Sequence, residues 1–275
     1  ICVLCGIQGA GNSTDNNPDN FTRLNITVGV AASAFQRLIF ATPGSATDSI
    51  RLDLETPTGI ADLSLLSGIT VRVLNGTTVV GNYPLNSSLL RLRLLTGNRF
   101  QVTVPAGGVY DRVEVRLNTV VGAVDNLNIY GARIIYPAPT ISNTGLASCA
   151  GSPTTLFATP NGGTTISWYA SPTGGTALAT GNSYTTPALT ANTTYYISVN
   201  KGTCANPDRI PVTVTVNPPI NFADANLPNA TLGSTYSRQL PAAIGGTPVF
   251  TYALSPGSTL PAGLSLTAEG TLAGT

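Results

Sequence analysis

The sequence contains no histidine and no methionine, and it has a single lysine, Lys201. The absence of histidine excludes a Ser-His-Asp triad, an H-E-x-x-H zinc motif and any imidazole base. A glycosidase needs two opposed carboxyl groups, and the glutamates of this chain are Glu55, Glu114 and Glu269. Glu55 and Glu114 share strand faces with charged neighbours, which predicts solvated cross-strand charges. We therefore expect a protein that is not an enzyme.

Charge is scarce as well. Charged residues make up 9% of the sequence, and the formal net charge is +1. A surplus this small provides no broad basic surface, so we expect neither nucleic acid nor anionic lipid as a partner. No apolar run reaches the roughly 18 residues of a membrane span, and no signal peptide is visible. We expect a processed secreted chain without a membrane span in this segment.

What the sequence does contain favours an all-β protein. Apolar residues make up 42% of the chain, and Thr, Ser, Asn and Gly cover most of the remainder, which suits strands and turns better than helices. Proline-containing linkers are predicted at "YPAPT" (136–140) and "VNPPI" (216–220). These linkers predict three domains, at residues 1–137, 138–218 and 219–275.

The first segment shows alternation of apolar and polar residues with a period of two. This pattern predicts strands with one buried face, in the runs 35–41, 48–55, 69–75, 89–95, 99–104 and 111–118. Asn75-Gly76 predicts a tight hairpin turn between two of the strands. Many short strands without a helix predict a β-sandwich of the jelly-roll type.

Four cysteines, Cys2, Cys5, Cys149 and Cys204, give an even count in a chain rich in turns. This favours an oxidising compartment and two disulfides, and hence an extracellular location. A Cys149–Cys204 bridge would close about 55 residues and contribute about 4 kcal/mol. The Cys2-x-x-Cys5 pair could instead be a redox pair or half of a zinc site, although a structural disulfide fits the start of the chain better.

The second segment predicts an Ig-like sandwich, with Ile166 and Trp168 on one buried strand face and Tyr195 and Ile197 on another. Its "WYASPTGG" run (168–175) and "TTYY" run (193–196) resemble the Ig-like repeat of very large bacterial surface proteins that the type IX secretion system exports. The resemblance covers nearly the whole segment. It implies a multidomain secreted adhesin.

The third segment is similar to another Ig-type repeat of such proteins, whose signature is Leu-Pro-x-Gly-Leu-Ser-Leu followed by Gly-Thr-hydrophobic-x-Gly-Thr. Residues 260–266 and 270–275 match this signature. The repeat normally continues through further strands, so the resemblance implies an incomplete sandwich at 219–275. An unfinished sandwich would expose an unpaired strand edge.

The first segment resembles galactose-binding-like, discoidin-type jelly rolls in "GNSTDNNPDNFTRL" (11–24) and "VDNLNIYGARI" (124–134). Its "CVLC" opening is also typical of an N-terminal module of the same surface proteins. In the sugar-binding relatives, the first loop and the last strand hold a structural calcium. The resemblance implies calcium ligands among Asp15, Asp19, Asn20 and Asp125. A turn without an ion explains the loop equally well.

Glycan binding needs exposed aromatic rings with polar neighbours. Asn20, Phe21 and Tyr110 are the candidates in the first segment, and packing in the fold is the competing interpretation for both aromatic residues. Asp48-Ser49-Ile50 also fits the short motif of bacterial O-glycosylation, which makes Ser49 a candidate glycosylation site.

These observations predict a non-enzymatic segment of a large surface adhesin, stalk or filament protein. Its expected partner is a cell-surface glycan or protein receptor, and polar faces with few charges allow a homo-oligomer or fibre. The alternative is a discoidin-like carbohydrate-binding module, with or without calcium, in a secreted polysaccharide-active protein.

Overall fold

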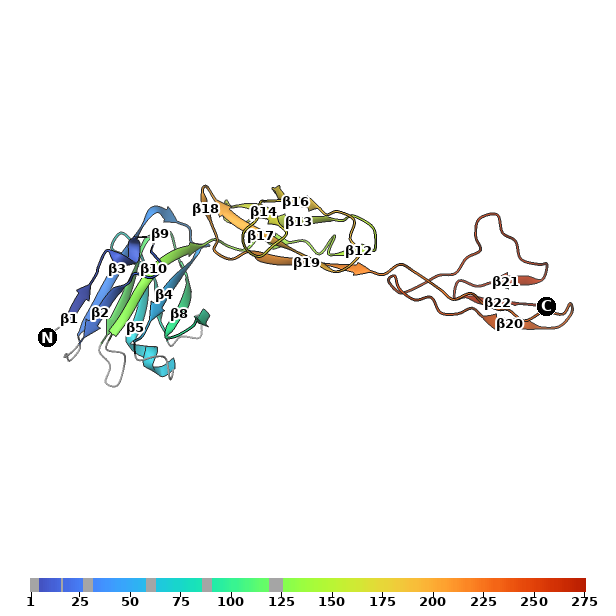
Figure 1. Cartoon of the computed structure of the whole chain (residues 1–275), viewed down its shortest axis with the longest axis horizontal. Helices are drawn as coiled ribbons and strands as arrows, with labels where there is room; N and C mark the ends of the chain where they lie inside the picture. Colours follow the sequence, from blue (N-terminus) through green and yellow to red (C-terminus); the bar gives the residue numbers. More distant parts are fainter. Residues whose placement is uncertain (1–4, 16, 27–31, 58–62, 86–90, 119–125) are drawn as a thin grey trace. The chain divides into compact units, whose positions relative to one another are not determined.

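The computed structural model describes all residues except 1–4, 16, 27–31, 58–62, 86–90 and 119–125 (Figure 1). Strands make up nearly all of its regular structure, and the helices among the described residues are two short 3-10 segments, η1 (Asn12–Thr14) and η2 (Leu63–Gly68). The prediction of an all-β fold is confirmed. Within this part of the chain, no helix is long and apolar enough to cross a bilayer.

Two compact units divide the chain. The first unit consists of three stretches, 1–140, 160–167 and 198–209. The second unit consists of residues 141–159, 168–197 and 210–275. Because the two units alternate along the sequence, the predicted domain boundaries stay a prediction.

The first unit contains a sandwich of two sheets (Figure 1). The six-stranded sheet has the order β1 (Cys5–Gln8), β2 (Thr22–Ile26), β10 (Asn126–Ile135), β4 (Ser49–Glu55), β8 (Arg99–Pro105) and β7 (Arg91–Leu94). The four-stranded sheet has the order β3 (Ser33–Gly44), β9 (Tyr110–Asn118), β5 (Ile69–Asn75) and β6 (Thr78–Pro84). All the pairings within the two sheets for which a register is defined are antiparallel.

Alternating side chains build the core of this sandwich. On β4, Ile50, Leu52 and Leu54 are fully buried, whereas the residues between them point outward. The same alternation on β5, β8 and β9 buries apolar side chains from both sheets in one cluster. Successive strand residues point to opposite faces, so each buried row leaves a row of polar side chains on the outside of its sheet. These outer faces are where charged residues meet across strands.

The predicted hairpin joins β5 to β6, with its turn one residue later than expected. Asn75 is the last residue of β5 and pairs with Thr78, so Gly76 and Thr77 occupy the turn. Gly76 has φ +60, a conformation that glycine adopts without a steric penalty. The Gly76 amide also donates a hydrogen bond of 3.0 Å to Oδ1 of Asp111.

A second sandwich follows in sequence, as predicted. Its smaller sheet has the order β11 (Thr140–Ile141), β13 (Thr155–Thr159) and β16 (Ser183–Thr185). Its larger sheet has the order β12 (Ala147–Cys149), β19 (Ile210–Asn217), β17 (Thr193–Lys201), β14 (Thr165–Tyr169) and β15 (Ala179–Thr180), with β18 (Cys204–Ala205) paired to β17.

Trp168 lies in the core of this second sandwich, which confirms its predicted role. The side chain is fully buried, and its Nε1 donates a hydrogen bond of 3.0 Å to the Gly181 carbonyl. The Tyr184 ring stacks 6.1 Å from the indole and meets Tyr195 at 5.1 Å. Buried indole N–H groups need such an acceptor, so the site fixes the orientation of the ring.

Residues 219–275 form a three-stranded sheet in the order β20 (Tyr236–Gln239), β22 (Thr271–Gly274) and β21 (Leu264–Leu266). Leu272 is the one buried apolar side chain of this described stretch. Leu232 and Val249 are each 94% exposed. A stretch that buries so little apolar surface gains little hydrophobic stabilisation of its own.

Candidate functional site

The loop predicted to bind calcium is a series of side-chain turns. Asp15 Oδ1 accepts a hydrogen bond of 2.9 Å from the Asn17 amide, and Asp15 Oδ2 accepts one of 2.7 Å from Asn20 Nδ2. The Asp19 amide donates to Asn17 Oδ1 at 3.0 Å. The hydrogen bond from Asn20 and then that from the Asn17 amide lower the pKa of Asp15. Asp15 is thus a carboxylate whose two oxygens already accept hydrogen bonds from the loop.

The calcium site stays a prediction. The described residues hold no group of three or more His, Cys, Asp or Glu side chains that could bind a metal, and Asp125 lies outside them. Asp19 points towards Arg99 instead, with Oδ1 at 3.9 Å from the guanidinium. The turn geometry shown by Asp15 and Asn17 is the one that Asn and Asp adopt without an ion.

Two of the three predicted glycan-binding residues lie together. Asn20 and Phe21 line a surface hollow of about 280 Å³, with Arg23 beside them. The Phe21 ring is 5.3 Å from the Tyr130 ring, and the Arg23 guanidinium lies 5.1 Å from its centre. The Phe21 ring therefore packs against Tyr130 and Arg23, and it also borders the hollow.

The assignment of Tyr110 to a binding surface is wrong. Tyr110 is the first residue of β9, is fully buried, and meets the Phe40 ring at 5.5 Å. It pairs in register with Gly44, where any side chain would collide with the Tyr110 ring. Burial raises the pKa of the Tyr110 hydroxyl, and the nearby Asp48 raises it further. The strand predicted at 111–118 starts one residue too late, so the prediction places Tyr110 in a loop, whereas the structure places it in β9.

The predicted Cys149–Cys204 disulfide is also wrong, because both thiols are free and exposed. Cys149 lies opposite Asn217, at the end of β19. Cys204 lies opposite Lys201, at the end of β17. Since β17 and β19 run antiparallel, these are opposite ends of one sheet, whereas a disulfide needs Cα atoms about 4.4–6.8 Å apart.

The remaining predicted residues are Cys2, Cys5 and Ser49. Cys2 lies outside the described residues, so the Cys2–Cys5 bridge stays a prediction. Ser49 is the first residue of β4, is partly exposed and pairs with Pro105 and Ile135 of the neighbouring strands. The glycosylation of Ser49 likewise stays a prediction.

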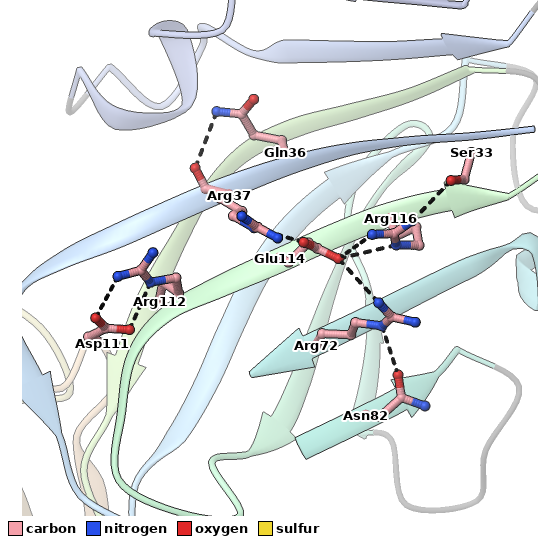
Figure 2. Close-up of polar contacts among 9 residues, drawn as sticks. All are labelled: Ser33, Gln36, Arg37, Arg72, Asn82, Asp111, Arg112, Glu114 and Arg116. Carbon is pink, nitrogen blue, oxygen red and sulfur yellow. Dashed lines mark hydrogen bonds and ion pairs between the residues drawn. The ribbon is translucent and has the colours of Figure 1, made fainter. Parts of the chain in front are cut away.

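The structure reveals a charged site that sequence reasoning missed. We call it the arginine cluster: Arg37, Arg72 and Arg116 around Glu114, on the outer face of the four-stranded sheet (Figure 2). The register of the strands brings these side chains together, because Glu114 on β9 lies directly opposite Arg37 on β3 and Arg72 on β5. Arg116 lies two residues along β9, on the same face. The expectation that Glu114 would be a solvated charge is wrong, because its side chain is 1% exposed.

Glu114 binds its three arginines with both carboxylate oxygens (Figure 2). Oε2 accepts from Arg37 Nε at 2.8 Å, and Oε1 accepts from Arg116 Nη2 at 2.8 Å and Nε at 3.1 Å. Arg72 is farther away, with Nη1 at 3.7 Å. Burial alone would raise the pKa of Glu114, but the hydrogen bonds and charges of Arg116 and Arg37 lower it. Glu114 is therefore an ionised counter-charge at neutral pH.

Further contacts hold the arginines in place. Arg72 Nε donates to Asn82 Oδ1 at 3.2 Å, and Arg116 Nη1 donates to Ser33 Oγ at 3.0 Å (Figure 2). The Arg37 and Arg116 guanidinium carbons lie 5.1 Å and 4.7 Å from the centre of the Phe35 ring. Cation–π contacts of this kind add to the attraction that orders the arginines.

Arg112 belongs to a separate pair on the same strand. Its Nε and Nη2 donate to the two carboxylate oxygens of Asp111 at 2.8 Å and 2.7 Å (Figure 2). The hydrogen bond from Arg112 is the main reason that the pKa of Asp111 falls to about 2. The pair is self-neutralising, so it takes no charge from the arginine cluster.

The six-stranded sheet carries a different glutamate network on its outer face. Glu55 Oε2 accepts hydrogen bonds from Tyr130 Oη at 2.6 Å and Asn128 Nδ2 at 2.7 Å, and Arg23 Nε donates to Asn128 Oδ1 at 2.8 Å. The hydrogen bond from Tyr130 is the largest cause of the lowered pKa of Glu55, against the effect of burial. Burial and then Glu55 raise the pKa of Tyr130 to about 12.

A family model described as "Ig-like domain CHU_C associated" matches residues 137–218. The match covers the second sandwich and confirms its Ig-like nature. No curated protein matches the chain.

Solved structures show distant likeness. A β-1,2-glucanase from Parabacteroides distasonis is 13% identical with a TM-score of 0.34, over 77% of this chain and 35% of the enzyme, so the chain spans about a third of its length. The three N-terminal domains of the bacteriophage RB49 Highly Immunogenic Outer Capsid protein are 16% identical with a TM-score of 0.34, over 89% of this chain and 86% of that one.

Extracellular domains 3–5 of Drosophila OTK are 11% identical with a TM-score of 0.27, over 89% of this chain and 82% of that one. With TM-scores this low, none of these structures supports a conclusion about the function of this chain. What the comparisons do show is that residues 137–218 are similar to the CHU_C-associated family of Ig-like domains.

Proposed function

We propose that this chain is a non-enzymatic, extracellular segment of a large secreted surface adhesin, stalk or filament protein that mediates attachment. The observation that carries the proposal is the match of residues 137–218 to an Ig-like family, in a chain that also contains a separate β-sandwich in its first unit. The resemblance to proteins exported by the type IX system supports the same assignment. A homo-oligomer or fibre is compatible with it.

The strand ladders suit such a mechanical role. In the first sandwich β4 lies between β10 and β8, and its pairings with both neighbours extend over most of the strand. Each ladder residue contributes backbone hydrogen bonds shielded by the packed core, and these must break together for the strand to leave the sheet. Cooperative ladders of this kind resist both pulling and proteolysis.

The positions of the glutamates support a function without catalysis. Glu55 and Glu114 lie on the outer faces of opposite sheets of one sandwich, with the apolar core between them. Acid and base in a glycosidase must flank one bond, about 5 to 10 Å apart. Both carboxyl groups also have lowered pKa values, which does not suit a general acid at neutral pH.

The proposal is tested on the cells that make the protein. Antibodies against residues 1–275 should label intact cells, and deletion of the gene should reduce attachment to surfaces while growth in suspension is unchanged. Restoring the gene should restore attachment. Label confined to the cytoplasmic fraction, or normal attachment of the deletion strain, would refute the proposal.

The alternative, a carbohydrate-binding module, keeps one supporting observation: Asn20 and Phe21 share a hollow of about 280 Å³ with Arg23. Tyr110 no longer supports it, because it is buried. A glycan array with the chain and its Phe21→Ala variant tests this alternative. Saturable binding that Phe21→Ala abolishes favours the module, and an array without hits eliminates it.

A further inference from the structure

The outer face of the four-stranded sheet has more positive than negative charge. Arg112 and Asp111 neutralise each other through two hydrogen bonds. The arginine cluster then sets three guanidinium groups against the single carboxylate of Glu114. The surplus is two positive charges, in a chain whose entire net charge is +1. The arginine cluster therefore carries a local surplus of positive charge.

Several N–H donors of the cluster have no acceptor among the described residues. A guanidinium group has five N–H bonds. Within the described residues, the Arg37 side chain hydrogen-bonds through Nε, which leaves both terminal nitrogens for another acceptor. Arg72 hydrogen-bonds through Nε and contacts Glu114 through Nη1, which leaves Nη2. The side chains are 43% and 37% exposed, so a ligand can reach these donors.

An exposed aromatic ring adjoins these donors. Phe35 is 37% exposed and lies opposite Arg116 in the register of β3 and β9, two residues from Arg37. Its ring is flanked by the guanidinium groups of Arg37 and Arg116. An apolar ring beside paired N–H donors matches a ligand that carries an anionic group on an apolar-faced ring.

We propose that the arginine cluster and Phe35 bind a carboxylate-bearing polysaccharide. Arg37 and Arg72 donate N–H groups to a uronate carboxylate, because the planar guanidinium fork fits that anion. The C–H face of a sugar ring packs against Phe35. The inference rests on the attachment function proposed above and names the class of polymer to which the protein attaches.

The size of the charge surplus favours this ligand over other polyanions. Nucleic-acid binding depends on many phosphate contacts, and anionic membranes are held by clusters of roughly four to eight basic residues. The cluster offers two accessible arginines and a partly covered third, Arg116, whose side chain is 20% exposed. One carboxylate per sugar residue matches that number.

Calorimetric titration of the full chain tests the proposal. Polygalacturonate should bind, and dextran, a neutral polysaccharide, should not. Raising the salt from about 20 mM to about 500 mM should weaken binding, because exposed charges are screened. Arg37→Lys keeps a charge for Glu114 but loses the planar fork, so it should raise the Kd about tenfold while thermal stability is maintained.

Two matched variants distinguish binding at the arginine cluster from general electrostatic attraction to the chain. Arg72→Gln should weaken binding about tenfold. Arg93→Gln removes an exposed arginine from β7 of the other sheet and should leave the Kd unchanged. Equal binding of dextran, an equal effect of Arg93→Gln, or tighter binding of duplex DNA or phosphatidylserine vesicles would overturn the proposal. If the deletion strain loses attachment but polygalacturonate does not bind, this inference fails while the attachment function stands.

Discussion

The two outer faces of the first sandwich each hold one glutamate that is kept ionised by different neighbours. On the four-stranded sheet, Glu114 is covered by three guanidinium groups, so its face retains surplus positive charge. On the six-stranded sheet, Glu55 is held by a phenol and an amide, both neutral donors. The comparison shows that a glutamate on the outer face of a sheet can be kept ionised either by direct contacts with guanidinium groups or by hydrogen bonds from uncharged donors.

Glu114→Gln should produce the largest loss of stability. The substitution removes the buried counter-charge and leaves three arginines that repel one another, which we expect to cost about 3 kcal/mol. The free energy of amide opening in peptides that cover β9, from hydrogen exchange, measures the loss. Glu269→Gln, at an exposed position, is the matched control and should change nothing. A loss no larger than that of Glu55→Gln would refute the contrast between the faces.

Acid should destabilise the sandwich through both glutamates. Their folded-state pKa values are lowered, so their stabilisation is complete above the unfolded value of about 4.3 and is lost as the pH falls through the lower folded values. Thermal unfolding between about pH 7 and pH 2 measures this dependence. Glu114→Gln and Glu55→Gln should each make the acid slope shallower. An unchanged slope in both variants would contradict the assignment.

Glu55→Gln should cost less, about 1 kcal/mol, because glutamine still offers a carbonyl oxygen to Tyr130 and Asn128. Hydrogen exchange in peptides that cover β4 measures the change. Gln101→Ala is a suitable comparison on the neighbouring strand, since it removes a hydrogen bond to Asp53 without touching Glu55. A cost above that of Glu114→Gln would reverse the comparison.

The strand pattern was predictable from the sequence, whereas the cluster was not. The alternation of Ile50, Leu52 and Leu54 with polar residues fixes which face is buried, whatever strands lie beside it. Glu114 shares its strand with Arg116, but its partner Arg37 lies 77 residues earlier. That pairing depends on which strands are neighbours and on their register, and a periodicity of two contains neither.

The wrong disulfide has the same origin. An even number of cysteines indicates how many bridges are possible, but the distance between Cys149 and Cys204 depends on the ends of β19 and β17 that they adjoin. Tyr110 shows a smaller error of this kind. One residue added to the start of β9 moves its ring from a predicted loop into the core, where Gly44 leaves space for it.

Tyr130→Phe should have the smallest effect on stability. It should change the Glu55 network and leave the arginine cluster unchanged. The change removes the hydroxyl that donates to Glu55 at 2.6 Å but keeps the ring, which the Arg99 guanidinium overlies at 3.6 Å. Since that hydrogen bond is the largest cause of the lowered pKa, the pKa of Glu55 should rise towards its ordinary value. A titration of the carboxyl carbons by NMR measures this shift, and the pKa of Glu114 on the opposite sheet serves as the internal control. Equal shifts at both glutamates would mean that the two faces are coupled through the core, whereas a shift at Glu55 alone shows that each face sets its own charge.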